Sequence, residues 1–413
     1  MSVAMPAVKA EIRFTAGASS TGFELGTALL GYSTLGAAAT WTDVSTDLRS
    51  FTTNRGKQRQ LDEYNSGTAS LVLDNRDRDF DPLNTSSPYY SGGSTQVKPG
   101  RWIRLYATHP VTAVEYQIYQ GVIREWQFGY EFPNEAIAKP IAADFLRDLN
   151  NANVTFTGTA ALSGAVVGEI LNEANIIPRD LDTGQETFQA VTFNGTNALA
   201  ALQIASRSEG GALSAVYANT ANQIVFEDRE SLTTNARSNT SQATFGTAAL
   251  PIDEVEISYS SDLIKNQVSL TRIGGTAQTQ TDTDSIDDYG IRSFTQTGYY
   301  NNTDGNVSSI AQSYIDSFAD ATLRVTKITL KPRMNAALMT EALSRQIRDR
   351  ITVSYEPPPG GTVVTQEMFI SGVSHRAHAE EWETIFTLES TTGRSPYWSL
   401  GTSELGSSTT LGF

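Results

Sequence analysis

The feature that most constrains this chain is an alternation of apolar and polar side chains with a period of two residues. In residues 8–14 the apolar positions are separated by Lys9, Glu11 and Arg13. Such a period gives an extended strand one buried face and one wet face. Charged residues make up only 18% of the chain, which disfavours a coiled coil, while abundant Thr, Tyr, Phe and Val suit strands. The sequence therefore predicts a mainly β protein.

The 413 residues divide into stretches of different pattern, and this length allows several domains. Two helical patterns, one stopped by Pro178 and one capped by Asn197, mark an α+β insert between two β regions. The polar residues 274–306 are predicted to form a long loop. The expected segments are 1–40 (a strand and a Leu-Gly-rich arm), 41–150 (first β domain), 151–247 (α+β insert), 248–395 (second β domain, with helices) and 396–413 (a second Leu-Gly-rich arm).

Composition excludes several classes of protein. The chain has no cysteine, so disulfides, thiolate zinc sites and thiol catalysis are excluded. We expect no membrane span, because no apolar run approaches the length that a bilayer requires. We also expect no secretory signal, because the first residues lack a charged region followed by an apolar one. The formal charge of −15 argues against gripping a nucleic-acid backbone.

The two arms share a Leu-Gly pattern. Residues 25–36 read LGTALLGYSTLG and residues 400–412 read LGTSELGSSTTLG. One interpretation is low-complexity turn sequence near each terminus. The sharper hypothesis is that both arms lie on neighbouring subunits and seat leucines in repeated pockets. The candidate subunit-contact residues are Leu25, Leu30, Leu35, Leu400, Leu405 and Leu411.

One acidic segment resembles the start of a calcium loop. Asp77, Asp79 and Asp81 have the required spacing, but Pro82 replaces the glycine and Pro88 replaces the bidentate glutamate. The alternative is a turn built by Asp and Asn, with neighbouring arginines balancing the charge. We therefore predict no metal site here.

Other candidates for chemistry are equally incomplete. His375 and His378 are three residues apart, but they lie between strand-like runs, where this spacing points side chains to opposite faces. Residues 26–31 have the glycine spacing of a phosphate loop, but Tyr32 stands where lysine is required. We predict no catalytic residues, no metal and no cofactor.

Residues 323–350 are locally basic, with seven Lys or Arg against Glu341 and Asp349. Such a run might contact DNA or an acidic partner subunit. The other interpretation is the solvated face of a strand–helix pair.

Several motifs follow one another in a characteristic order along the chain. Residues 54–82, NRGKQRQLDEYNSGTASLVLDNRDRDFDP, are followed by NTSSPYY, KPGRWIRLY and YQGVIREW. Further on, VEISYSSDLIKNQVSLTRIGG precedes SIDDYGIRSF. The first set resembles the N-terminal region of tail-tip proteins of long-tailed, siphovirus-like bacteriophages, and the second is similar to a signature of the baseplate-hub family. The resemblance covers most of residues 41–395 and leaves both arms outside.

This resemblance implies a structural virion protein with two related β-barrel domains flanking a small α/β module. In such hubs a homotrimer joins the six-fold tail tube to the three-fold tip. Partners would be a distal tail or tail tube protein above and tip or fibre proteins below. DNA would pass at genome ejection without specific binding, and the negative charge of three chains would repel its phosphates. The location would be the tail tip of the virion, assembled in the host cytoplasm.

Two alternatives belong to other classes. A receptor- or carbohydrate-binding minor tail protein would stack sugars on exposed aromatic residues. The aromatic candidates are Tyr89, Tyr90, Tyr299, Tyr300 and Trp398. An enzyme that cleaves glycans would need a close pair of carboxylates, which sequence spacing alone does not reveal. We expect that the protein is not an enzyme.

Overall fold

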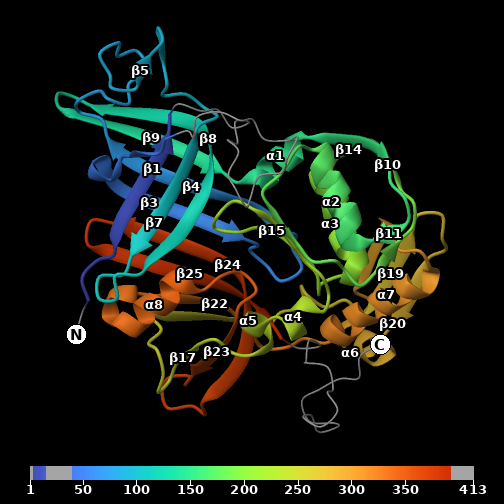
Figure 1. The fold of residues 1–413 in the computed structure, drawn as a ribbon. Helices are drawn as coiled ribbons and strands as arrows, with labels where there is room; N and C mark the ends of the chain where they lie inside the picture. The colour runs from blue at the N-terminus through green and yellow to red at the C-terminus, as the bar shows by residue number, and fades with distance from the viewer. Residues whose placement is uncertain (1–2, 15–39, 392–413) are drawn as a thin grey trace.

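A computed structural model describes residues 3–14 and 40–391. Its main element is a sheet of 13 strands, in which strands from both β regions lie side by side (Figure 1). The predicted mainly β class is confirmed. The α+β insert, hereafter the module, packs beside this sheet on the right of Figure 1.

The first β region contributes strands to one half of the sheet, all paired antiparallel in the order β3-β4-β9-β8-β7-β1-β2. As the alternation predicts, Ala69, Leu71 and Leu73 on β4 are buried. The strands are β1 (Ala7–Arg13), β2 (Thr42–Asp43), β3 (Leu48–Gly56), β4 (Asn65–Asp74), β7 (Trp102–Thr108), β8 (Glu115–Glu131) and β9 (Glu135–Ala143), with the small hairpin β5 (Tyr90–Ser91) and β6 (Ser94–Thr95).

Helix α1 closes the first β region, and the module follows it. Helices α1 and α3 start at caps that the sequence predicts. The Asp144 side chain accepts a hydrogen bond from the Leu146 amide at 3.0 Å, and Asn197 accepts one from the Ala200 amide at 3.0 Å. The elements are α1 (Phe145–Asn151), β10 (Asn153–Thr157), β11 (Ala161–Leu162), α2 (Ser163–Glu173), β12 (Arg179–Leu181), β13 (Thr187–Phe188), β14 (Thr192–Asn197), α3 (Ala198–Gly210), β15 (Ala215–Ala218), β16 (Ile224–Glu227), α4 (Ser231–Thr234) and α5 (Ala236–Asn239).

The C-terminal part supplies the rest of the sheet and most of the remaining helices. Its elements are β17 (Thr244–Gly246), β18 (Glu254–Ser258), β19 (Gln267–Arg272), β20 (Gln278–Thr281), α6 (Thr283–Tyr289), β21 (Ser293–Tyr299), α7 (Asp304–Phe318), β22 (Arg324–Leu330), α8 (Ala336–Ser344), β23 (Arg350–Tyr355), β24 (Val364–His378) and β25 (Glu381–Ser390).

The prediction that residues 274–306 form a long loop is wrong. The segment contains β20, α6 and β21, and both strands pair with β19 in a separate three-stranded sheet. Asp282 starts α6 by accepting a hydrogen bond from the Ser285 amide at 2.9 Å. The residues of β20 are half-buried or exposed, so this strand lacks the apolar alternation that would have revealed it.

Strand β3 joins the two β regions by pairing with β24 from Ser50↔His378 to Gly56↔Gly372. We call this pairing the seam. Gly56 has φ +97°, and a Cβ there would lie 2.2 Å from the carbonyl oxygen of Ser371. Only glycine fits this close approach with this backbone conformation. The domain boundaries given above stay predictions.

Helix α8 connects the apolar cores on the two sides of the seam. Met339 and Leu343 belong to the core of the first β region, whereas Leu338 and Ala342 belong to the core around β22–β25. Residues four apart share one helix face, so α8 presents two adjacent apolar faces to two cores. The helix thereby resists displacement of one β region against the other.

Candidate functional site

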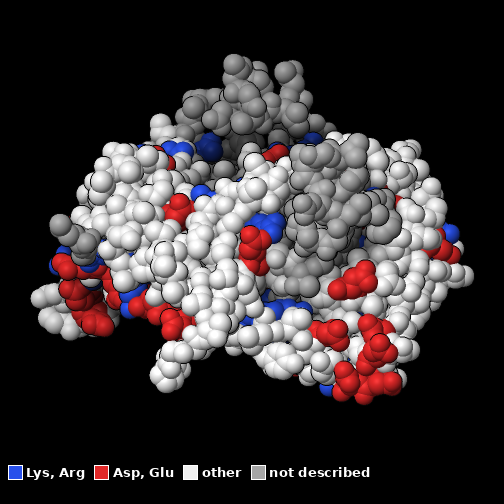
Figure 2. All heavy atoms as spheres, turned by 90° about the horizontal axis from the view of Figure 1, so that it is seen from below, with Lys and Arg blue, Asp and Glu red and all other residues white. Residues whose placement is uncertain are grey.

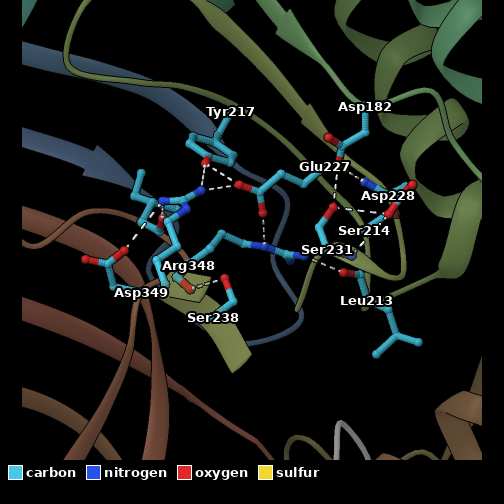
Figure 3. Close-up of polar contacts among 12 residues, drawn as sticks. Asp182, Leu213, Ser214, Tyr217, Glu227, Asp228, Ser231, Ser238, Arg348 and Asp349 are labelled. Atoms are coloured by element: carbon cyan, nitrogen blue, oxygen red, sulfur yellow. Dashed lines mark hydrogen bonds and ion pairs between the residues drawn. The ribbon is translucent and has the colours of Figure 1, made fainter. Parts of the chain in front are cut away.

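A buried cluster of charges lies where the module meets the large sheet (Figure 3). We call it the junction network, and it consists of Tyr217, Glu227, Arg237, Arg348 and Asp349. The first two stand on the paired strands β15 and β16, and Arg237 stands on α5. The last two residues come from the turn before β23. The network therefore joins segments that are more than 100 residues apart in sequence.

Glu227 is the centre of the junction network. Its Oε2 lies 2.7 Å from Nε of Arg348. Its Oε1 accepts hydrogen bonds from the Tyr217 hydroxyl at 2.8 Å and from the Arg237 guanidinium. Two cations and one hydroxyl thus satisfy both carboxylate oxygens, as a buried charge requires.

Arg348 ties this carboxylate to the sheet. Its side chain is 1% exposed, and its Nη2 donates to the carbonyl oxygen of Leu213 at 2.7 Å. Its own amide donates to the Ile370 carbonyl on β24 at 2.7 Å, and its carbonyl accepts from the Ser238 hydroxyl at 3.0 Å. One residue thereby links three segments of the module to the strand that forms the seam.

The electrostatics of the network suit anchoring rather than proton transfer. Burial alone would raise the pKa of Glu227, but Arg348 and Arg237 outweigh burial and lower it. Burial raises the pKa of the Tyr217 hydroxyl well above its usual value, and the Glu227 charge adds to this effect. A carboxylate held charged by two arginines and a phenol held neutral provide neither a base nor a nucleophile near neutral pH.

A polar cavity of about 670 Å³ lies next to the junction network. Asp180 and Asp182 line it together with Arg237 and Tyr217. Asp182 is already engaged, because it accepts hydrogen bonds from the Asp228 amide at 3.0 Å and from the Ser231 hydroxyl. Small-molecule sites are mostly apolar with few polar groups, so this lining is not typical of one.

A second buried ion pair stabilises the seam. Nζ of Lys57, directly after β3, lies 2.7 Å from Oε2 of Glu389 on β25, and both side chains are buried. Lys57 also donates to the carbonyl oxygen of Gln60 at 3.0 Å. The main-chain pairing of the seam is therefore supported by a charge pair that spans it.

The acidic segment around Asp77 forms a turn, as the alternative to a calcium loop predicts. Arg78 pairs with Asp81 at 2.7 Å, and the side-chain oxygen of Asn75 accepts from the Phe80 amide at 2.9 Å. Among the described residues, no group of three or more His, Asp or Glu could hold a metal ion.

The two histidines of β24 point to opposite faces of the strand. His375 is buried, with Nδ1 at 3.0 Å from the Thr384 hydroxyl, whereas His378 is exposed. Burial, with a smaller contribution from Arg55, lowers the pKa of His375 to about 3. The pair does not form a common ligand set.

The cations of the basic run 323–350 are largely engaged within the chain. Most of its cations pair with carboxylates of the same chain. The pairs are Lys327–Glu256, Lys331–Asp253, Arg345–Glu341, Arg348–Glu227 and Arg350–Glu367. These ion pairs reduce the net charge that the run offers to DNA or to a partner subunit, and its contact with either stays a prediction.

The aromatic residues proposed for sugar stacking are not collected on one surface. Tyr299 and Tyr300 are buried, so their predicted exposure is wrong. Tyr89 stacks on Phe14 with ring centroids 4.0 Å apart. Trp398 and the six arm leucines lie outside the described residues.

Sequence reasoning missed Glu227 and Tyr217. Glu227 ends an otherwise apolar strand, Ile-Val-Phe-Glu, between segments that pack into cores. A carboxylate in such a strand signals that a cation must come from elsewhere in the fold. The basic run contained that cation, but only the tertiary structure identifies it as Arg348.

Comparison with solved structures identifies the fold. A tail protein from Neisseria meningitidis MC58 is 10% identical, and the match covers 93% of this chain and 96% of that one with a TM-score of 0.55. The 43 kDa tail protein of prophage MuSo2 from Shewanella oneidensis is 12% identical over 87% and 96%, also with a TM-score of 0.55. A chain of the Francisella PdpA–VgrG complex is 8% identical over 95% and 54%, with a TM-score of 0.50.

The predicted resemblance to phage tail proteins is confirmed at the level of the fold. In sequence comparison, no protein-family model and no curated protein matches the chain. Among the described helices, none has the length and apolar character needed to cross a bilayer.

Proposed function

We propose that this protein is a structural component of a phage tail and forms a homotrimeric hub at the tail tip. The observation that carries the proposal is the match over nearly the whole length of two tail proteins, one of them from a prophage. The hub would join the six-fold tail tube to the three-fold tip, with tip or fibre proteins below. It would act by holding neighbours in place, without catalysis.

The construction of the chain supports a mechanical role. The seam makes both β regions parts of one sheet, and α8 packs into a core on each side of it. The junction network fixes the module to the same sheet through buried charges. A connector needs such stiffness, because interfaces between subunits transmit force only if the elements behind them do not shift.

The charge supports a passage for DNA. Each chain carries a formal −15, and most cations of the basic run are paired internally. Figure 2 shows acidic side chains gathered at both sides of the face seen from below. A negative lumen would repel phosphates and let the genome slide at ejection.

The mass of the purified protein in solution tests the trimer. Light scattering over a concentration series should give three times 44.7 kDa, and electron micrographs of the same sample should show three-fold averages. A monomer at every concentration, also after mixing with the tail tube protein, would contradict the hub.

We propose further that the two arms contact neighbouring subunits through Leu25, Leu30, Leu35, Leu400, Leu405 and Leu411. Deleting residues 399–413 should then weaken assembly and leave the melting temperature of the monomer unchanged. A second variant replaces only the three C-terminal leucines with serine, so that the arm keeps its length and loses its apolar side chains. Unchanged assembly in both variants would refute the role of the C-terminal arm.

A further inference from the structure

Strand β18 is the outermost strand of the large sheet. It pairs with β22 on one side, and no described segment pairs with its other side. An edge strand presents unpaired amide and carbonyl groups to any extended chain that approaches. Natural sheets protect such an edge with charged side chains, proline, bulges or a covering loop. Strand β18, Glu-Val-Glu-Ile-Ser, has a bulge between Glu256 and Ile257 and no lysine or proline. Its own charges are those of two glutamates, which repel an acidic strand and not a basic one.

Exposed apolar side chains continue along this edge. Ile257 is 39% exposed, and Tyr259, which follows the strand, is 67% exposed. Leu323, directly before β22, is 46% exposed and lies next to the Ser258↔Arg324 pair. Exposed apolar residues gathered at one place indicate an interaction site more often than single ones do.

The apolar edge extends toward α6. Tyr259 lies near Tyr289, which is the last residue of α6. Two residues further on, Ile291 is 64% exposed. The surface therefore contains the strand edge, its apolar side chains and the end of a helix.

The surroundings of this edge are acidic. Glu254 and Glu256 stand on β18 itself, and Glu256 also pairs with Lys327. Burial raises the pKa of the Tyr289 hydroxyl, and the nearby charges of Asp320 and Asp288 add to this effect. Asp320 also lines a neighbouring hollow of about 430 Å³, and no Lys or Arg lines that hollow. Its other acidic lining residues are Asp282, Asp284 and Asp316.

We propose that the edge of β18 binds an extended, basic segment of another protein by strand addition. Main-chain hydrogen bonds to β18 would supply affinity, and alternate side chains would pack on Ile257 and Tyr259. A Lys or Arg of the added strand would lie over the acidic hollow. This inference goes beyond the hub and does not require the trimer.

The charge of the chain itself excludes its own segments as the occupant. Residues 15–39 contain no Lys or Arg, and residues 392–413 contain only Arg394. A second copy of the same edge, paired antiparallel and centred on Val255, would bring Glu254 of each copy opposite Glu256 of the other. Like charges placed directly opposite each other destabilise a strand pair. The complement must therefore come from a different, basic polypeptide.

Fluorescence anisotropy with designed peptides tests the proposal on the full chain. The probe is a labelled peptide in which Lys and Val alternate, compared with one in which Glu replaces Lys. A third peptide keeps the lysines but has proline at two central positions, which prevents strand pairing without changing charge. We expect the Lys-Val peptide to bind at least about tenfold more tightly than either control peptide.

Variants locate the binding. Ile257→Lys places a positive charge on the edge and should weaken the binding of the Lys-Val peptide at least about tenfold. Leu83→Lys is the control, because Leu83 is also apolar and is more exposed, at 84%, but lies in a turn of the first β region. Circular dichroism checks that both variants fold. Amide hydrogen exchange should show new protection in residues 254–258 when the peptide is bound.

Equal binding of the lysine peptides with and without proline would overturn the proposal, because attraction would then be purely electrostatic. No effect of Ile257→Lys, or binding that appears only after residues 399–413 are deleted, would overturn it as well. The mass of each sample separates this test from the proposed function. Peptide binding by a protein that never forms a trimer refutes only the hub, and a trimer without peptide binding refutes only the edge.

Discussion

Removing the charge of Glu227 should destabilise the protein far more than removing the charge of an exposed glutamate. The substitution Glu227→Gln retains shape and leaves Arg348, whose side chain is 1% exposed, without its carboxylate at 2.7 Å. Breaking a buried ion pair by removing one partner costs about 3–5 kcal/mol, because the other charge stays buried. At the usual entropy of unfolding per residue, a chain of this length would melt about 5 °C lower.

Calorimetry and urea denaturation of matched variants measure this effect. The control is Glu135→Gln, which removes an ion pair with Arg49 at the same kind of distance, 2.9 Å, but with side chains 35% and 49% exposed. Exposed pairs contribute at most about 1 kcal/mol. A double variant, Glu227→Gln with Arg348→Met, should recover part of the loss because it removes the stranded cation.

Two outcomes would refute the reasoning. If Glu227→Gln and Glu135→Gln lowered the free energy of unfolding equally, the junction network would not hold the module to the sheet. If the double variant were as unstable as the sum of the single variants, Arg348 would not depend on Glu227 for its neutralisation.

The remaining predictions concern the seam and acid stability. Gly56→Ala should lower the free energy of unfolding by more than about 3 kcal/mol, because it combines a positive φ with a Cβ 2.2 Å from a carbonyl oxygen. The control Gly92→Ala, with φ +59° and open space around the Cβ, should lower it by about 1 kcal/mol. Equal melting temperatures of the two variants would contradict the close approach. His375 has a lowered pKa, about 3, so the unfolded chain binds its proton first, and stability is lost as pH falls below about 6.5. At pH 4.5 this loss is about 3 kcal/mol, and His375→Gln should abolish it while the exposed His378→Gln should not. Denaturation at pH 7.5 and pH 4.5 measures this loss of stability. If His375→Gln kept the pH dependence of the unsubstituted protein, His375 would not be its cause.

The sequence by itself determined most local structure. The alternation in residues 69–73 and the apolar positions of residues 10–14 predicted the buried face, and Asp144 and Asn197 marked the starts of two helices. These features depend on contacts within a few residues, so the local sequence contains the needed information. Glu11 on the predicted wet face is also buried, because it pairs with Lys9 and Arg104. The order of motifs was sufficient to indicate the family of folds. The polar strand β20 before α6 was not predicted, because it lacks the apolar period by which strands are recognised.

Only the tertiary structure decided how distant segments combine. The seam pairs β3 with β24 across more than 300 residues, and Glu227 meets Arg348 across 121. The tertiary structure also pairs most cations of the basic run with carboxylates of the same chain. It buries Tyr299 and Tyr300, which the sequence had suggested as exposed aromatic residues. The physical reason is that a side chain's charge and hydropathy state what partner it requires, whereas the folded topology determines which residue is within reach to provide it.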